Sequence, residues 1–547
     1  MQLTAIQKVK FRRFLLNPWV IWALAVSLLV AFPLLVIAPE MLVPGTTVWR
    51  HMLANLVPAY VLNTLLLMTG VAVLTLVMGV STAWLVTMYR FPGRKIFQWG
   101  LILPIAIPAY INGFAWAGML EYTSPLYVFL RNHFGIDTGA FLFFNILSLP
   151  GAIFILSLSL YPYVYLITRA YFLKQSTVLF DVSASLGRGP WRTFFSTALP
   201  LARPAIVAGV SLALMEVLND YGLARYFGVD TFTTGIFTAW FAFADPSAAL
   251  KLSGYLMIFV LLLIVAERSQ RGQMRYGMVG SHYRPVHTRP MKGWRSLLAT
   301  LACLLPFLLG FLLPAAMLVY WSSQTAGQVL DGRFWELLRN SFVLAAMASV
   351  LVVGAAIFIA FTARTFPSRF VRFLAKVATL GYALPGAVVA IGVMVPFIWL
   401  DQRLIDTTPL SRMILTGTWF ALLYAYLVRF MAVGYNSIDS GLQKVSITLD
   451  EASRSMGLSH WKTLRRVNMP LLQGSLLSAA LLVFIDVLKE LPLTLILRPF
   501  NFDTLAIRAF EYASDERVAE AAPAAMIIIL VGMVPVIILN RMMGKGK

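Results

Sequence analysis

The chain has 547 residues, of which 44 are Lys or Arg and 23 are Asp or Glu, so its formal net charge is +21. Only 12% of the residues are charged while 59% are apolar, and the mean hydropathy is +0.79. An ordinary soluble domain carries about twice that share of charged residues. This composition therefore excludes a soluble multidomain protein and an intrinsically disordered chain.

Twelve apolar segments, most of about membrane-spanning length, follow one another along the chain. A helix needs about 20 apolar residues to cross the hydrocarbon core of a bilayer. The twelve predicted spans are 17–38, 59–88, 97–119, 141–168, 204–224, 252–266, 297–320, 341–363, 373–399, 413–434, 474–492 and 523–540. The first has basic residues before it, as a signal peptide has, but it is too long and lacks a small-x-small cleavage site. We therefore expect an uncleaved anchor.

Basic residues are concentrated in alternate connections between these spans. The N-terminal segment, the alternate connections and the C-terminal tail hold 32 of the 44 basic residues but only five of the 23 acidic ones. Such a bias marks the cytoplasmic side of a membrane protein, so we expect both termini in the cytoplasm. The positive charge then reflects orientation in a lipid bilayer, and it indicates no nucleic-acid partner.

The sequence divides into two halves that repeat each other. Residues 267–296 form a polar, basic stretch, which we interpret as a cytoplasmic linker between a first half, 1–266, and a second half, 297–547. The C-terminal parts of the halves align without a gap at an offset of 270 residues, and the earlier parts at an offset of 275–277. Matched pairs include Gly187 with Gly457, Trp191 with Trp461, Pro200 with Pro470, Phe91-Pro92 with Phe366-Pro367, and Pro108 with Pro385. Six spans per half give both copies the same orientation, so the sequence predicts an all-α polytopic protein made of parallel repeats.

A patterned cytoplasmic segment lies between the fourth and fifth spans of each half. We call residues 181–200 the first coupling segment and residues 451–470 the second coupling segment. In each, an acidic residue lies six positions before a Gly, and the pattern predicts a short helix that ends at this Gly in the left-handed conformation. A second, amphipathic helix follows, and we expect the closing Pro200 or Pro470 to end it. Amphipathic helices lying on the bilayer surface are the alternative, but these need no Gly at a fixed distance from a Pro.

The two coupling segments resemble the Glu-Ala-Ala-x3-Gly-x9-Ile-x-Leu-Pro loop of binding-protein-dependent ABC importer permeases. The residues that match are Glu451, Ala452, Gly457 and Pro470 in the second segment, and Gly187, Leu199 and Pro200 in the first, where Asp181 stands in for the Glu. Ser183 and Ser453 replace the second Ala, and Ala184 is a further expected residue of the first coupling segment. The resemblance implies two fused type-I permease halves of six helices each, in a bacterial inner membrane. It also implies two copies of an ABC ATPase subunit, one docked on each coupling segment, and an extracytoplasmic substrate-binding protein.

No Gly-x4-Gly-Lys-Ser/Thr phosphate-binding loop occurs in the chain. Without that loop the chain does not hold ATP phosphates in this manner. We therefore expect a permease that is not itself an enzyme and binds no cofactor, with ATP used by the partner subunit.

Acidic residues in the fifth span of each half are candidates for the substrate pathway, because ionisable groups inside a membrane are costly. Glu216 and Asp220 are four residues apart, which predicts a shared helical face, and the repeat places Asp486 and Glu490 at the same positions. Carboxylates along a passage would suit a hard cation. The alternative is structural pairing, in which Lys489 neutralises Asp486 or Glu490.

Two short stretches, 218–236 and 489–494, resemble the fused permeases of ferric-iron importers more narrowly. This resemblance implies import of ferric iron that an extracytoplasmic protein delivers. Thiamine and aminophosphonate permeases share the architecture and remain alternative substrate classes. A gradient-driven secondary transporter with Glu216 and Asp486 as relay groups is an alternative of another kind. A channel is disfavoured because nothing resembles a selectivity filter.

Overall fold

The computed structural model describes residues 16–121, 124–135, 145–174, 189–271, 288–408 and 413–544. Within these ranges the only strands are β1 (Tyr89–Arg90) and β2 (Arg289–Pro290), which form one short parallel pair, and the other elements are helical. Among the same residues, nine helices are long and apolar enough to span a membrane, or eleven when each of two bent pairs is one span. These helices confirm the predicted all-α polytopic fold.

Helix α21 (Trp419–Leu442) accounts for the predicted span that is not among those eleven. It has 24 residues, and it carries Arg429 near its middle, which lowers its mean hydropathy. With α21 included, each of the twelve predicted segments contains a helix, although several boundaries differ by a few residues.

The chain forms two compact units. Unit I is drawn from Met1–Val48, Ala239–Gly254 and Gly332–Ile507, and unit II from Trp49–Thr238, Tyr255–Asp331 and Arg508–Lys547. Unit I contains α2 (Pro18–Glu40), α18 (Gly332–Thr365), α19 (Arg369–Ala378), η5 (Leu380–Ala383), α20 (Gly386–Thr407), α21, α22 (Ile447–Ser455), α23 (His460–Thr463), η6 (Leu464–Asn468), α24 (Met469–Leu471), α25 (Gln473–Leu488) and α26 (Pro492–Leu497).

Unit II contains the elements of the first half that follow α2, together with three helices of the second half. These are α4 (Val57–Met88), α5 (Arg94–Gly100), η1 (Leu103–Ala106), α6 (Ala109–Leu120), α7 (Pro125–Phe134), α9 (Leu149–Lys174), α11 (Pro190–Thr193), η2 (Phe194–Ala198), α12 (Leu199–Asn219), α13 (Gly222–Tyr226), α14 (Phe232–Phe237), α16 (Trp294–Phe307), η4 (Leu308–Leu312), α17 (Leu313–Val329) and α28 (Val518–Gly544). Four elements have residues in both units: α3 (Thr47–Asn55), η3 (Thr238–Ala242), α15 (Pro246–Arg271) and α27 (Leu505–Ser514).

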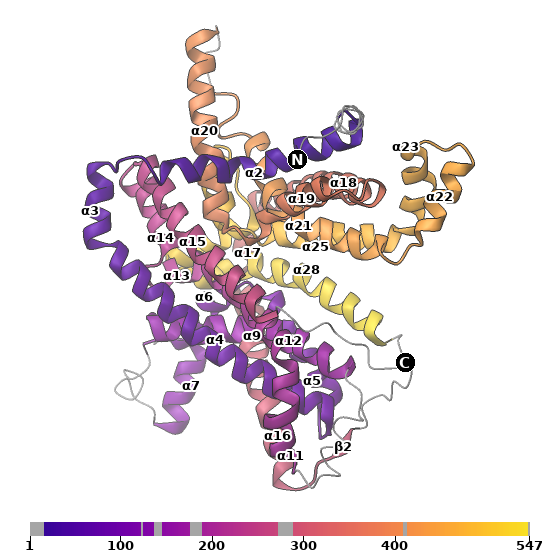
Figure 1. Ribbon diagram of the computed structural model, residues 1–547. Helices are drawn as coiled ribbons and strands as arrows, with labels where there is room; N and C mark the ends of the chain where they lie inside the picture. The colour runs from indigo at the N-terminus through magenta and orange to yellow at the C-terminus, as the bar shows by residue number, and fades with distance from the viewer. Residues whose placement is uncertain are drawn as a thin grey trace. The chain divides into compact units, whose positions relative to one another are not determined.

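The first helix among the described residues, α2, packs in unit I against helices of the second half (Figure 1). The hydroxyl of Ser27 donates to the carbonyl of Leu374 in α19 at 3.0 Å, and the hydroxyl of Tyr424 in α21 donates to the carbonyl of Leu29 at 2.6 Å. The predicted anchor is therefore an integral part of a helix bundle.

Unit II shows the reciprocal arrangement. The first helical segment of the second half, α16–η4–α17, packs on first-half helices, where the indole of Trp116 donates to the carbonyl of Leu309 at 3.1 Å. In the same unit, the hydroxyl of Thr325 in α17 donates to the carbonyl of Ala519 in α28 at 3.0 Å. Each sequence half thus contributes its first helix to the compact unit that holds most of the other half.

The third span of each half is broken, so the predicted single helices over 97–119 and 373–399 are wrong. In the first half, α5–η1 and α6 meet at a bend of 96°. Pro108 and Pro385 lie directly before α6 and α20 in an extended conformation with ψ of 143°. A proline lacks the N–H that a continuing helix needs, and it disfavours helical geometry in the residue before it. The repeat therefore preserves a helix break at both sites.

Exposed apolar side chains form a stripe along α4, a helix of membrane-spanning length. On α4, Leu62, Leu66, Val73 and Val77 are exposed and share one side of the helix. A soluble protein rarely exposes so long an apolar stripe. The stripe fits a multi-pass membrane protein.

Candidate functional site

The second coupling segment folds as two short helices joined by a turn. The hydroxyl of Ser446 accepts from the N–H of Thr448 at 3.3 Å at the start of α22. The helix ends at Gly457, which has a φ of 83°. The N–H of Leu458 donates to the carbonyl of Ser453 at 3.2 Å, and that of Gly457 to the carbonyl of Arg454 at 2.9 Å, which together form a Schellman cap. The predicted helix end at Gly457 is confirmed.

The residues matched in the second coupling segment lie at its surface. Glu451, Ala452, Gly457 and Pro470 are all exposed. Two large apolar side chains are exposed beside them, Met456 at 75% and Trp461 at 49%. The segment thus presents carboxylate and apolar groups together, as a protein-docking surface does.

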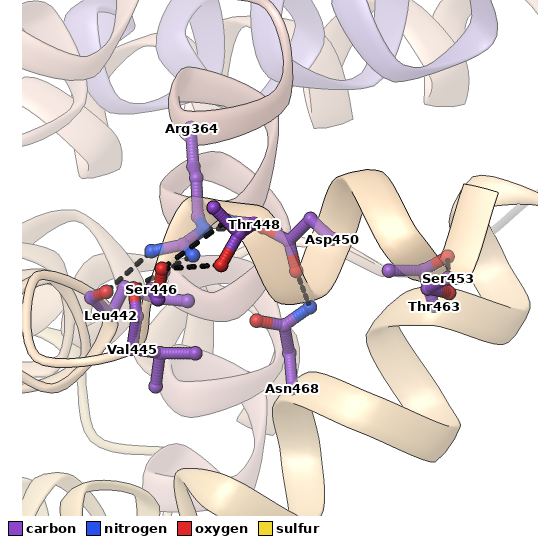
Figure 2. A network of polar contacts seen from close by, with 9 residues as sticks. All are labelled: Arg364, Leu442, Val445, Ser446, Thr448, Asp450, Ser453, Thr463 and Asn468. Carbon is purple, nitrogen blue, oxygen red and sulfur yellow. Dashed lines mark hydrogen bonds and ion pairs between the residues drawn. The ribbon is translucent and has the colours of Figure 1, made fainter. Parts of the chain in front are cut away.

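Asp450, directly before the segment, faces the opposite way. Its Oδ2 accepts from Nε of Arg364 at 2.6 Å, and its Oδ1 accepts from Nδ2 of Asn468 at 2.8 Å (Figure 2). Arg364 comes from the last turn of α18, and it also donates to the carbonyl of Leu442, the last residue of α21, and to that of Val445, which follows α21. One guanidinium group therefore joins the end of α18, the end of α21 and the start of the coupling segment.

Further contacts fix the second helix of the segment. Thr463 and Ser453 share a buried hydroxyl hydrogen bond of 2.8 Å, which joins α23 to α22. The ring of Trp461 stacks on Phe358 of α18, with the centroids 5.8 Å apart, and it lies 6.4 Å from the ring of Trp19 in α2. Both helices of the segment thus contact α18.

The positive charge on the second coupling segment comes from Arg and Lys side chains. The pKa of His460 is lowered, first because the ring is partly removed from water and second because Arg454 is near. A neutral His460 around pH 7 leaves Lys462, Arg465 and Arg466, all exposed, as basic groups of this face. These groups suit an acidic partner surface.

Part of the first coupling segment lies outside the described residues, including the predicted Asp181, Ala184 and Gly187. Of the matched residues that are described, Leu199 is half-buried and Pro200 is exposed. Aromatic packing holds the start of its second helix, because the ring of Trp84 in α4 lies 5.2 Å from Phe194 and 5.3 Å from Phe172.

Pro200 does not end a helix, and that prediction is wrong. The helix continues from Trp191 through Pro200 to Asn219. A π-helical turn, η2, precedes the proline, and it loosens the backbone that the ring would otherwise strain. In the second half a similar turn, η6, precedes Pro470. There the helix ends at Leu471, and the chain bends by 81° into α25.

Carboxylates of the fifth span in the second half are paired with cations. Glu490 accepts from Arg429, with Nη2 of Arg429 and Oε2 of Glu490 3.2 Å apart. The side chain of Arg429 is only 8% exposed and that of Glu490 only 6%. Lys489 pairs with Asp486 at 2.9 Å and is about a third exposed. Structural pairing, the alternative weighed above, therefore accounts for both carboxylates without excluding a place on the pathway.

Arg429 is one of the 32 basic residues that the sequence assigns to the cytoplasmic set, and this assignment is wrong, because Arg429 is buried within α21.

The corresponding carboxylates of the first half do not share a helical face. Glu216 lies in α12 and is half-buried, but α12 ends at Asn219 and Asp220 adopts an extended ψ of 126°. The carboxylate of Asp220 accepts from the N–H of Ala224 at 3.0 Å, so it begins α13. The four-residue spacing suggested a shared face because it assumed that the helix continued.

Among the described residues, no three His, Cys, Asp or Glu side chains are grouped so that they could hold a metal ion. Glu216, Asp220, Asp486 and Glu490 thus form no metal cage in this conformation. Their place on a substrate pathway stays a prediction.

Two functional pairs escaped the sequence reasoning. Asp450 and Arg364 are 86 residues apart, and neither is matched by a residue of the same type at the corresponding repeat position. For Arg429 a signal was present, because it falls inside the predicted span 413–434, where an arginine requires a partner.

The chain is similar in sequence to proteins of a known transport family. The family model described as "Binding-protein-dependent transport system inner membrane component" matches the chain twice, over residues 75–273 and 352–546. The Fe(3+)-transport system permease protein FbpB 2 of Haemophilus influenzae is 27% identical over 485 residues, covering 88% of this chain and 89% of the relative.

Other relatives cover less. The putative ferric transport system permease protein FbpB 1 of the same organism is 25% identical, over 84% of this chain and 74% of the relative. The putative 2-aminoethylphosphonate transport system permease protein PhnV of Salmonella typhimurium is 25% identical over 39% of this chain and 76% of the relative.

Proposed function

The chain belongs to the family of binding-protein-dependent transport system inner membrane components, and from that membership we propose that it imports ferric iron with energy from a separate ATPase. It is a multi-pass membrane protein made of two fused permease repeats. In the proposed system, an extracytoplasmic binding protein delivers the ion, and two ATPase subunits bind the coupling segments from the cytoplasm. The N- and C-termini lie on that same side.

The second coupling segment is the observation that carries the proposal. Its exposed surface combines Glu451 with the apolar side chains of Met456 and Trp461, while its inner side is bonded to α18 through Arg364. A segment that is exposed outward and bonded inward can pass a partner's movement to the membrane helices. ATP binding would draw the two coupling segments together and open the bundle outward, and hydrolysis would reset it.

Iron as the substrate is supported by two relatives that cover most of this chain and are named as ferric transport permeases. The phosphonate relative covers a smaller share, which leaves an aminophosphonate as the second candidate. Thiamine remains the third. In the proposed system the metal is cargo, and the binding protein selects it.

Transport by the reconstituted complex tests this proposal. Proteoliposomes that contain this chain and its ATPase are supplied with binding protein loaded with iron, 2-aminoethylphosphonate or thiamine. We expect iron to accumulate only with ATP and with both partners present. Accumulation of another substrate would contradict the choice of iron and leave the importer intact. Uptake by this chain alone, driven by an imposed proton or sodium gradient, would instead support a secondary transporter.

A further inference from the structure

We propose that the Arg364–Asp450 ion pair is the mechanical link between the second coupling segment and helices α18 and α21. The inference rests on the proposed function and deepens it. Both are positioning residues, because they act through the elements that they join. Asp450 lies in α22 directly before the coupling segment, and Arg364 lies in the last turn of α18.

The geometry of the pair suits a contact that transmits movement between the coupling segment and α18. The Nε–Oδ2 distance is 2.6 Å, and the two side chains are only 12% and 14% exposed. Removal from water strengthens the attraction and protects it from salt, unlike an exposed ion pair. The second carboxylate oxygen of Asp450 accepts from Asn468, near the other end of the segment. The Asn468 hydrogen bond joins two parts of the segment to each other, whereas only the ion pair joins Asp450 to α18.

Two adjacent carboxylates thus have different tasks. Successive residues on a helix point about 100° apart, so Asp450 can face inward while Glu451 faces outward. Glu451 is exposed and available to a partner, whereas Asp450 is half-buried against Arg364. The resemblance to known permeases singles out Glu451, and the structure adds Asp450.

A second contact prevents rotation about the ion pair. Trp461 stacks on Phe358 of α18, and Phe358 lies six residues, or about 9 Å along the helix, from Arg364. Two contacts at different heights on one helix fix both the position and the orientation of the coupling segment. The segment and α18 should therefore move as one body.

The sequence of the first half has no matching charged pair at the corresponding repeat positions. The repeat places Tyr89 opposite Arg364, Phe180 opposite Asp450 and Ala198 opposite Asn468, so no charge is present at these positions. The contacts of Trp84 with Phe172 and Phe194 are the described counterpart.

The test measures how much iron enters per ATP hydrolysed. Asp450→Asn removes the charge but keeps an oxygen for Asn468, and the control Asn468→Ala removes that hydrogen bond while keeping the ion pair. In the reconstituted complex, we expect Asp450→Asn to lower uptake per ATP about tenfold, within the range of coupling free energies between sites. ATPase binding should persist, and Asn468→Ala should stay within about twofold of the wild type.

Full coupling in Asp450→Asn, with the wild type active, would overturn the link and leave the proposed function standing. Lack of ATP-driven uptake in the wild type would instead contradict the proposed function. A second measurement keeps Asp450 and Arg364 unchanged, so it does not depend on whether Asp450→Asn folds. With spin labels at the exposed positions Met456 and Leu351 of a Cys303→Ala chain, we expect one unchanged distance with and without ATP. A change in that distance would contradict the proposal.

Discussion

Arg429 and Glu490 form an ion pair that is almost completely buried, with Nη2 and Oε2 3.2 Å apart. Oε1 of Glu490 also accepts from the N–H of Leu493 at 3.1 Å, so the carboxylate holds the start of α26 as well. The pair joins α21 to the chain that follows α25 inside unit I. Removing one partner would leave an uncompensated charge in a medium of low dielectric constant.

Glu490→Gln should therefore destabilise the protein by about 3–5 kcal/mol, because it leaves Arg429 unpaired. In a Cys303→Ser chain, Val483→Cys places a single buried thiol in α25 of unit I, so fluorescence of a thiol-reactive dye reports unfolding of that unit on heating. Asp486→Asn is the control, since the Asp486–Lys489 pair is partly exposed and is worth at most about 1 kcal/mol. The double variant Arg429→Gln with Glu490→Gln should recover much of the loss. An unchanged unfolding temperature in Glu490→Gln would show that Arg429 finds another partner.

Gly386→Ala tests how closely α20 approaches this pair. An added methyl group at Gly386 would collide with the guanidinium of Arg429 and lie 2.7 Å from Oε1 of Glu490. We expect a lower unfolding temperature in the same dye assay, although alanine normally favours a helix by about 1 kcal/mol. Gly354→Ala in α18 is the matched control, because nothing lies within 4 Å of its added methyl group. Equal effects of the two substitutions would contradict the packing described above.

Gly457→Ala tests the turn of the second coupling segment. The φ of 83° costs a residue with a side chain about 1–2 kcal/mol, although the surrounding space is open. We expect faster hydrogen–deuterium exchange in α22 and weaker ATP-driven uptake. Gly474→Ala has equally open space within α25 and no left-handed backbone, so it should change neither measurement. If Gly457→Ala leaves exchange in α22 unaltered, the left-handed cap does not fix the helix end.

The proposed orientation is tested by single cysteines in a Cys303→Ser chain. Met456→Cys and Phe500→Cys replace side chains that are 75% and 93% exposed. Because the two positions are predicted on opposite sides of the membrane, an impermeant maleimide should label Met456→Cys only in inside-out vesicles. It should label Phe500→Cys only in right-side-out vesicles. Binding of the ATPase should protect Met456→Cys alone. Labelling of both cysteines from one side would refute this orientation.

Local signals in the sequence predicted the features that depend on a few neighbouring residues. The helix end at Gly457 is one, because its cap needs only a residue that tolerates a positive φ. The twelve apolar segments are another, since length and hydropathy alone identify them. Both rely on physics within about twenty residues.

Features that depend on contacts between distant parts of the chain could not be predicted from local sequence patterns. The partner of Asp450 lies 86 residues away, and the end of α12 before Asp220 is set by a turn that the four-residue spacing does not report. Pro200 showed a related difficulty, because a π-helical turn lets a helix continue where a proline ordinarily stops it. Sequence patterns state what a residue prefers locally, and the tertiary structure decides whether that preference prevails.

The reciprocal placement of the first helices has a consequence for any attempt to divide this molecule. Residues 1–266 produced alone would lack α16 and α17, and the apolar surface that meets them in unit II would be left open to lipid. Residues 297–547 alone would likewise lack α2, whose Ser27 hydroxyl donates to the carbonyl of Leu374 and whose Leu29 carbonyl accepts from Tyr424 in unit I. Two fragments cut within 267–296 should therefore be unstable apart yet assemble when made in the same cell. Each half of the duplication supplies the first helical segment that the other half's compact unit needs. Fusion into one chain therefore keeps these two exchanged segments at a one-to-one ratio.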